Sequence, residues 1–364
     1  MGSNHKLGAA STDSSRRALQ LVSYPKKILI LTLLAIFLLF LSLLHLHGDI
    51  KSTDNLDKYN VRFVSGKEIH LTDKCKEKLD ALDRFHDKRR AARIQFANKA
   101  KEAGKNVYEM YWNRGDINKD RERRRALTFD LFEPEAVCLL EERFGGLSDE
   151  RFAAFGDGPK FVCGVDYLRE SYKKRNERCL VYSVGSNNNI RFERAVKNSI
   201  GCEIHTFDPT LRTPFVGNDY ADFHPWGLGK EGEKVRVENR DNVEFTTQSV
   251  ENVMKQLGHV GRKIDIFKID CEGCEFEAMP PVLEAITNGT LQIDQLLIEL
   301  HAHVTYEVMT DFFEAADKAG FRITHKERNG WGCGGTSCVE YAFVNESFLR
   351  RTTASAICGQ NTGS

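Results

Sequence analysis

The sequence predicts an α/β domain built on a doubly wound, mostly parallel sheet with an antiparallel edge hairpin. Three apolar, β-rich runs at 180–184, 202–207 and 264–269 are each followed by a glycine or a carboxylate. Helical patterns separate these runs, and such alternation favours parallel strands joined by right-handed crossovers. Because parallel strands share one carboxyl edge, the glycine and the carboxylates should border a single nucleotide-type pocket there.

The spacing of apolar residues predicts the remaining elements. Val250, Val253, Met254 and Leu257 lie at i, i+3, i+4 and i+7, which is typical of one helix face. The glycine-rich segment 330–335 should turn the last two strands into the antiparallel hairpin. In chain order we expect a helix at 190–199, a strand at 243–247, a helix at 250–257, the strand at 264–269, a helix after Pro281, a strand at 295–300, a helix at 309–316, and strands at 321–325 and 339–344.

Length and charge narrow the class of protein. The chain has 364 residues and 41% apolar residues, enough for one large domain with accessory segments. Lysine plus arginine and aspartate plus glutamate both number 52, so no global field attracts polyanions. We expect no nucleic-acid partner.

Residues 28–47 are predicted to form a membrane-spanning signal anchor. At about 1.5 Å per residue, this apolar run nearly crosses a hydrocarbon core of about 30 Å. Basic residues precede the run and mostly acidic residues follow it, which places the N-terminus in the cytosol. A cleaved signal peptide is the alternative, but Leu46-His-Gly-Asp49 is not a small-residue cleavage site. We therefore expect a single-pass type II membrane protein of the Golgi or endoplasmic reticulum with a luminal main domain.

Composition changes along the chain predict its organisation. Residues 48–125 are heavily charged, as expected of exposed helices that hold the main domain away from the bilayer. The apolar residues of 126–178 are enough for a helical cap on that domain. The expected parts are a disordered cytosolic tail at 1–27, the anchor at 28–47, a helical stem at 48–125, a helical cap at 126–178, the main domain at 179–347 and a C-terminal tail at 348–364.

Ten cysteines fit an oxidising lumen, where they could partly pair. The pairs Cys271 with Cys274 and Cys333 with Cys338 could instead form two halves of a zinc site, although disulfides or buried thiols are the simpler interpretation. Two N-glycosylation acceptor triplets begin at Asn288 and Asn345 and suit the same side of the membrane.

The predicted pocket contains a glycine and a carboxylate at adjacent strand ends. Gly185 can let the backbone approach a ligand closely, and Asn187 tolerates left-handed φ values. Asp208 lies 23 residues beyond Gly185, near the separation of about 20 at which an acidic residue reaches ribose hydroxyls. It could alternatively cap a helix before Pro209. Because no G-x-G-x-x-G and no P-loop lysine occurs here, we expect a nucleoside bound without a pyrophosphate, as S-adenosylmethionine would be.

Four motifs follow one another along the predicted domain: Val181-Tyr-Ser-Val-Gly185, Thr206-Phe-Asp208, Gly227-Leu-Gly229 and Ile264-Asp-Ile-Phe-Lys-Ile-Asp-Cys-Glu-Gly-Cys-Glu275. Together they resemble the FkbM-type class I methyltransferases. Two further segments, Leu297-Ile-Glu-Leu-His301 and Cys338-Val-Glu-Tyr-Ala-Phe343, are similar more narrowly to the membrane-anchored animal methyltransferase-like proteins. The resemblance covers roughly residues 130–345.

The resemblance implies a Rossmann-like fold and S-adenosylmethionine as the cofactor. The chain departs from the family pattern at Asn188 and Asn189, where small residues are common, and at Asp208, where glutamate is more frequent. The implied contacts are Gly185, Ser186 and Asn187 with the methionine moiety, Asp208 with the ribose, Trp226 and Gly227 with the adenine, and Asp270 and Glu272 with the transferable methyl group.

Methyl transfer requires an in-line approach of a nucleophile and a base for its proton. Glu272 and His301, at the tips of neighbouring predicted strands, are the candidate bases, and Asp270 would orient substrate or cofactor. Alternatively, Glu272 caps the next helix and His301 is a hydrogen-bonded core residue. His301 and His303 could share one strand face, but no further ligand is spaced to complete a metal site, so we expect no metal.

These observations favour an O-methyltransferase that modifies a hydroxyl on a glycan or small molecule of the secretory pathway. A secretory glycosyltransferase is the first alternative, because an anchor, a stem and a luminal domain suit such enzymes equally well. The second is a cofactor-binding protein without turnover, since fold alone never proves activity.

Overall fold

The computed structural model describes residues 72–102, 129–146, 156–237, 243–302, 304–335 and 337–358. The predicted cytosolic tail and the membrane anchor lie outside these residues. Among the described helices, none combines the length and the apolar character that a membrane span needs. The described residues all belong to one compact unit, 61–364.

A seven-stranded sheet forms the centre of the fold, in the order β11-β12-β10-β9-β3-β4-β5. The five strands from β10 to β5 pair in parallel. Strand β12 is antiparallel to both of its neighbours, which confirms the expected edge hairpin but inserts the last strand between β10 and β11. The strands are β3 (Leu180–Val184), β4 (Glu203–Phe207), β5 (Asp222–His224), β9 (Ile264–Ile269), β10 (Ile293–His301), β11 (Phe321–Arg328) and β12 (Cys338–Asn345).

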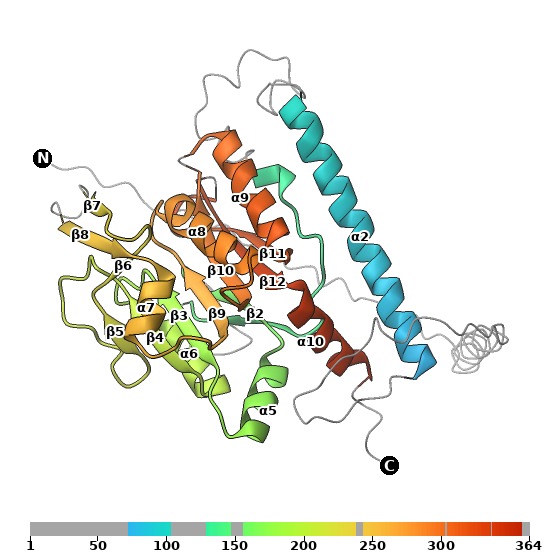
Figure 1. Ribbon diagram of the computed structural model, residues 1–364, viewed down its shortest axis with the longest axis horizontal. Helices are drawn as coiled ribbons and strands as arrows, with labels where there is room; N and C mark the ends of the chain where they lie inside the picture. Colours follow the sequence, from blue (N-terminus) through green and yellow to red (C-terminus); the bar gives the residue numbers. More distant parts are fainter. Residues whose placement is uncertain are drawn as a thin grey trace, which may run out of the picture. The chain divides into compact units, whose positions relative to one another are not determined.

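Helices cover both faces of this sheet (Figure 1). On one face, Tyr182 packs in a core with side chains of α7, α8 and α9. On the other face, Val181 packs with side chains of α5, α6 and α10. The alternation of side chains along each strand therefore fills two cores, and the doubly wound prediction is confirmed. The helices are α5 (Val165–Arg175), α6 (Arg191–Ile200), α7 (Val250–Gln256), α8 (Glu275–Thr287), α9 (Tyr306–Lys318) and α10 (Glu346–Cys358).

Two predicted elements differ from the structure. Helix α8 begins at Glu275, not after Pro281, and contains Pro280 and Pro281. Burial of Phe276 and Met279 against the first core supports the turns before these prolines, which each lack a hydrogen-bond donor. The run at 243–247 is a strand, but β8 (Val243–Gln248) lies outside the main sheet. It pairs with β6 (Gly227–Leu228) and β7 (Lys234–Val237) in a separate three-stranded sheet.

The segment expected as a helical cap is largely not helical in its described part. It contains the 3-10 turn η3 (Phe129–Leu131), an antiparallel pair of strands β1 (Glu141–Phe144) and β2 (Lys160–Cys163), and α5. The apolar residues Phe144 and Val162 are buried in the second core, so they pack as strands rather than as a helix face. The prediction was right about apolar packing and wrong about secondary structure.

Helix α2 (Asp73–Glu102) is part of the predicted stem, and it packs on the main domain instead of acting as a spacer. A disulfide joins Cys75 to Cys358 in α10, and Figure 1 shows the two helices near each other. Most of the predicted C-terminal tail is therefore the helix α10, with Phe348 and Leu349 buried. The many charges of α2 suggested solvation, but several of them pair with charges of the domain.

The best-buried of these charges is Arg93. Its Nε donates to Glu135 at 2.6 Å and its Nη2 to Asp317 in α9 at 3.2 Å. The side chain of Glu135 is 2% exposed, so its charge depends on Arg93.

Replacing Arg93 should destabilise the fold through Glu135. The Arg93→Ala variant is expected to lose about 3–5 kcal/mol of unfolding free energy, because an unpaired carboxylate stays buried. The control Arg84→Ala removes an exposed arginine from the same helix and should change stability by less than about 0.5 kcal/mol. Urea denaturation measures both, and equal losses would contradict the assignment.

Candidate functional site

The ends of β3, β4 and β9 are drawn together at a single glycine. Gly185 follows β3 with φ +73°, and a Cβ placed on it would lie 1.7 Å from the carbonyl oxygen of Asp270. The Gly185 amide donates to the Phe207 carbonyl at 2.9 Å, and the Asp270 amide donates to the Val184 carbonyl at 3.1 Å. Only glycine permits this approach, which the sequence had singled out.

Asp208 stands directly beside the Gly185 turn. One of its oxygens accepts the backbone amide of Asn187 at 2.8 Å, and the other accepts the amide and hydroxyl of Thr210 at 2.9 and 2.7 Å. The glycine and the carboxylate that the sequence paired are thus brought together. Because a carboxylate offers about four acceptor positions, this one retains about one for a ligand. Asp208 therefore both shapes the loop and faces the site.

A cavity of about 240 Å³ opens at this edge of the sheet. Its far wall comes from the small sheet, where Phe245 packs closely against Gly227. Trp226 does not line the cavity, because its ring stacks on His224 at 4.6 Å. Of the predicted cofactor-binding residues, Gly185, Ser186, Asn187, Asp208, Gly227 and Asp270 do line it, together with Glu272.

The lining of the cavity is acidic and suits a cationic ligand. Lys268 also lines it, but its amine donates to the carbonyls of Val184 and Gly185 at 3.2 and 2.7 Å and so serves the backbone. S-adenosylmethionine carries a sulfonium charge, an adenosine sugar and an amino acid, and these match carboxylates, the free position on Asp208 and the loop after Gly185. The acidic residues of the lining are Asp157, Asp208, Glu233, Asp270, Glu272 and Glu277.

The three predicted catalytic residues also meet. Acceptor or ligand atoms of Asp270, Glu272 and His301 lie within 4.8 Å of one another. The loop between β9 and α8 carries Glu272 at φ +61°. Buried Glu275 holds that loop by accepting the amides of Cys271 and Gly273 at 3.1 and 3.2 Å. His301 lies behind Glu272 and does not line the cavity itself.

The charge state of His301 bears on its predicted role. Its Nδ1 is 3.1 Å from Glu275 and its Nε2 is 3.4 Å from Glu272. Burial favours the neutral ring, but the hydrogen bonds with these two carboxylates raise the pKa of His301 to about 11. A ring that holds its proton near neutral pH cannot accept another, so His301 does not suit the predicted role of base. The other candidate base, Glu272, has a side chain that is 76% exposed.

A buried charge cluster behind Asp270 escaped the sequence analysis. The amine of Lys160 is 1% exposed, lies 3.3 Å from Asp270 and also binds Glu340. Glu340 in β12 lies directly opposite Glu299 in the neighbouring strand β10, and both residues are buried. Burial opposes ionisation of Asp270, but Lys160, Lys268 and His301 lower its pKa to about 2. The signal in the sequence that could have revealed this cluster is that Lys160, Glu299 and Glu340 lie in mostly apolar strands.

Glu299 differs from Asp270 in its charge state. Burial, together with the neighbouring charges of Glu340 and Asp270, raises the pKa of Glu299 to about 9. The proton on Glu299 relieves the repulsion between its carboxyl group and the carboxylates of Glu340 and Asp270.

Disulfides tie down the loops around the cavity. All ten cysteines pair, and because Cys271–Cys274 and Cys333–Cys338 are themselves disulfides, the alternative of two zinc half-sites is wrong for this structure. Cys138–Cys163 joins the segment before β1 to the end of β2, Cys179–Cys202 joins the residues that precede β3 and β4, and Cys75–Cys358 joins α2 to α10.

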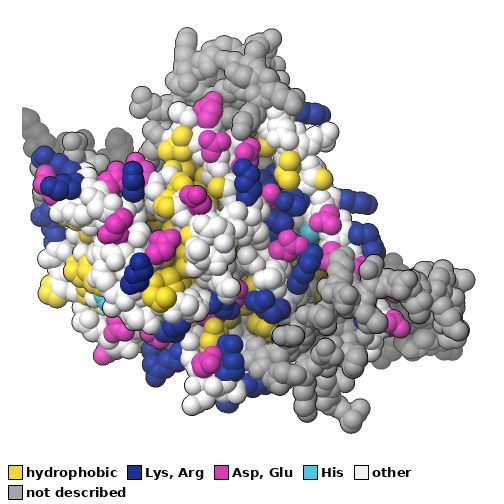
Figure 2. Space-filling model, viewed as in Figure 1, with side chains coloured by type: hydrophobic (Ala, Val, Ile, Leu, Met, Phe, Trp, Pro, Cys, Tyr) yellow, Lys and Arg dark blue, Asp and Glu magenta, His cyan; other side chains and the backbone are white. Residues whose placement is uncertain are grey.

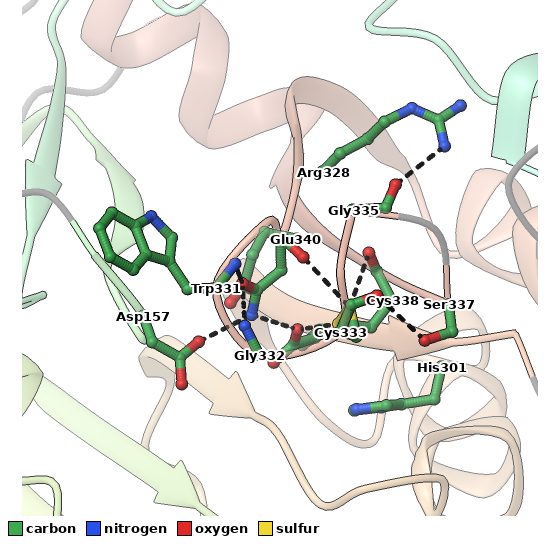
Figure 3. The surroundings of a disulfide bond; sticks show 12 residues. Asp157, His301, Arg328, Trp331, Gly332, Cys333, Gly335, Ser337, Cys338 and Glu340 are labelled. Carbon is green, nitrogen blue, oxygen red and sulfur yellow. Dashed lines mark hydrogen bonds between the residues drawn. A yellow bond between two sulfur atoms is a disulfide. The ribbon is translucent and has the colours of Figure 1, made fainter.

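The Cys333–Cys338 loop reaches the cavity wall through Asn329, which binds the cavity-lining residue Asp157. The amide of Asn329 donates to Asp157 and to Glu299, both at 2.8 Å. Its side-chain oxygen accepts the backbone amides of Trp331 and Gly332. The indole of Trp331 is 65% exposed, and Figure 3 shows it on the side of the disulfide where Asp157 lies. The loop that carries Trp331 thus borders Asp157, a residue that lines the cavity.

Replacing Gly185 should test the close approach. Gly185→Ala is expected to lose more than about 3 kcal/mol of unfolding free energy or to fail to fold, because its methyl group meets backbone. Gly201→Ala is the matched control: φ is +83° there, but nothing lies within 4 Å of a Cβ. It should cost only about 1–2 kcal/mol in urea denaturation. Similar losses in the two variants would contradict the steric argument.

The charge state of Glu299 should appear in the pH dependence of stability. The pKa of this carboxyl is about 9 in the folded protein and about 4.5 in the unfolded chain. Its contribution to the free energy of unfolding is therefore fully present below about pH 4.5 and is lost as the pH rises towards 9. Glu299→Gln keeps the uncharged form, so its stability relative to wild type should grow by on the order of 1 kcal/mol per pH unit within this window.

Urea denaturation at several pH values within that window measures the difference. The control Glu284→Gln changes an exposed glutamate and should show no such trend. A difference between Glu299→Gln and wild type that is independent of pH would contradict a protonated Glu299.

A family model described as a methyltransferase domain matches residues 95–345 of this chain. Among curated relatives, the probable methyltransferase-like protein 24 of Homo sapiens is 27% identical over 158 residues, or 40% of this chain and 38% of that protein. The Rattus norvegicus protein of the same name is 28% identical, over 40% of this chain and 39% of its own length. The chain thus matches about two fifths of the length of each relative.

Solved structures show distant likenesses. The fibrillarin pre-rRNA processing protein of Methanococcus jannaschii is 11% identical, with a TM-score of 0.27 over 46% of this chain and 67% of that chain. The 1,6-didemethyltoxoflavin-N1-methyltransferase of Burkholderia thailandensis, solved with S-adenosylhomocysteine, is 10% identical, with a TM-score of 0.28 over 50% and 76% of the respective chains.

The family assignment rests on the family match, the strand order and the cavity. The match spans more than half of the chain, and it includes every strand of the central sheet. This chain belongs to the methyltransferase-domain family, with a Rossmann-like class I α/β fold and S-adenosylmethionine as its cofactor.

Proposed function

We propose that this chain transfers the methyl group of S-adenosylmethionine to a hydroxyl on a glycan or small molecule in the lumen of the Golgi or endoplasmic reticulum. The observation that carries the proposal is the acidic cavity bordered by Gly185, Asp208, Asp270 and Glu272. One end offers backbone and a ribose acceptor, and the other offers a carboxylate base.

When bound, the cofactor supplies an electrophilic methyl group on a sulfonium. Glu272 would accept the proton of the acceptor hydroxyl whose oxygen takes the methyl group. His301, which holds its proton between Glu272 and Glu275, donates to Glu272 and fixes its position. Asp270 stays ionised beside Lys160 and faces the sulfonium charge.

Two observations support a luminal, carbohydrate-type acceptor. Five disulfides that together use all ten cysteines suit an oxidising compartment, in keeping with the expected signal anchor at 28–47. Exposed Trp331, on the loop that borders Asp157, offers a flat apolar surface, and aromatic rings of this kind pack against ligands with one apolar face. On the face in Figure 2, basic and acidic side chains are interspersed, as in a protein without a single-sign charged surface.

The direct test supplies radiolabelled S-adenosylmethionine to membranes with and without the full chain. The proposal expects protein-dependent label in an ether-linked methyl group on a glycan or polyol, identified by mass spectrometry. Label on an amine, a thiol or a carboxyl group would overturn methyl transfer to a hydroxyl. Label on nothing, despite measurable cofactor binding, would favour the binding protein without turnover.

Removing the base should slow chemistry without weakening cofactor binding. Glu272→Gln is expected to lower kcat by at least about 100-fold, because the hydroxyl proton loses its acceptor. The dissociation constant for S-adenosylhomocysteine, measured by calorimetry, should change by less than about threefold. The control Glu251→Gln alters an exposed glutamate in α7 and should retain activity. An unchanged kcat in Glu272→Gln would contradict the base assignment.

A further inference from the structure

Three histidines (His205, His224 and His259) lie with Glu203 on the sheet face that α7 covers. Glu203 is the first residue of β4, His205 follows on the same strand, and His259 lies in the connection from α7 to β9. None of these three residues lines the cofactor cavity. The sequence analysis did not single them out, because 56 residues separate Glu203 from His259.

Two imidazoles converge on one carboxylate oxygen. Nε2 of His205 and Nε2 of His259 each lie 3.1 Å from Oε1 of Glu203. One atom from each of these three side chains lies within 4.8 Å of the other two. Ligands bound at about 2.0–2.1 Å to one tetrahedral zinc ion lie about 3.3 Å apart. The spacing between each histidine nitrogen and the carboxylate is therefore already close to that of a zinc site.

The second polar atom of each of these three side chains has a hydrogen-bond partner outside the cluster. Nδ1 of His205 is 2.9 Å from Nε2 of His224, and Nδ1 of His259 is 2.8 Å from the hydroxyl of Tyr182. The second oxygen of Glu203 accepts Arg262 at 2.9 Å. Metal-binding histidines almost always use their other nitrogen in this way, because the second contact fixes the ring and its tautomer.

The network accommodates either protons or a metal without moving the rings. Without metal, both Nε2 atoms carry hydrogen and donate to Glu203, while both Nδ1 atoms accept. With metal, hydrogen sits on the Nδ1 atoms, which donate to Tyr182 and His224, and the Nε2 lone pairs are available as ligands. Tyr182 and His224 can serve in both states because each can donate or accept.

Access differs among the three candidate ligands. The side chains of His205 and His259 are buried, at 8% and 5% exposed, whereas that of Glu203 is 28% exposed. An ion can therefore enter past Glu203, and water would supply the fourth ligand of a tetrahedral site. Two neutral imidazoles and one carboxylate form a donor set that zinc and related first-row divalent ions accept.

We propose that Glu203, His205 and His259 form a binding site for one divalent transition-metal ion of the zinc class. The ion would join the start of β4 to the connection between α7 and β9. Its distance from the methyl-transfer residues along the strands makes the role structural, and the proposal does not depend on the proposed acceptor.

The experiment uses the full chain, stripped with a chelator and titrated with zinc chloride in a calorimeter. Wild type should bind one equivalent of zinc. In His205→Gln and in His259→Gln, the zinc affinity of this site should be at least 100-fold lower. The control His325→Gln alters a histidine of β11 that pairs with Glu141 of β1, and it should bind zinc as wild type does. Equal zinc binding by the wild type and both cluster variants would overturn the proposal, as would no stoichiometric binding by wild type.

A second variant guards against misfolding of the first two. Tyr182→Phe keeps the buried ring and removes only the hydroxyl that supports His259, so zinc affinity should fall about 10–100-fold while the fold is retained. Visible absorption after cobalt substitution reports the coordination directly. A tetrahedral cobalt spectrum that disappears in His259→Gln supports the site, and an unchanged spectrum in that variant refutes it.

Discussion

The contact between Gly185 and the carbonyl of Asp270 is the constraint on which the rest of the site depends. A side chain at this position would enter the backbone of the neighbouring strand, so the two strand ends can meet only across a glycine. The meeting aligns the residues that follow each strand: the loop after Gly185, Asp208 after β4, and Asp270 with Glu272 after β9. Helices on both faces and the disulfide-bonded loops hold this edge in place, and the cavity is the space that remains.

Buried charge is the second organising feature of the site. Lys160, which comes from outside the central sheet, keeps Asp270 ionised, and Glu299 absorbs the excess negative charge by holding a proton. His301 also holds a proton, between the carboxylates of Glu272 and Glu275. The site therefore presents fixed negative charge to a cationic cofactor, and in our proposal the exposed carboxylate of Glu272 accepts the proton. The histidine cluster around Glu203 belongs to the same sheet but serves a separate purpose in our proposal.

Local patterns predicted those parts of the fold that local physics determines. Strands β3, β9 and β10 are buried along their whole length, so each was visible as an apolar run, and Gly185, Asp208 and Asp270 stood out as the residues that follow such runs. Periodicity could not show that β12 inserts between β10 and β11, or that α2 is bound to α10 through Cys75, because these pairings join distant segments. Composition also misled where packing overrides it. The prolines of α8 are tolerated inside a helix, and the apolar residues near Phe144 form strands.

The most direct test of the account is a crystal structure of the protein with S-adenosylhomocysteine. The account predicts that the amino acid end of the ligand lies along the loop after Gly185, that the ribose contacts Asp208, and that the sulfur faces Asp270 and Glu272. A ligand bound elsewhere, or a ribose that makes no contact with Asp208 while the cavity keeps its present shape, would contradict it.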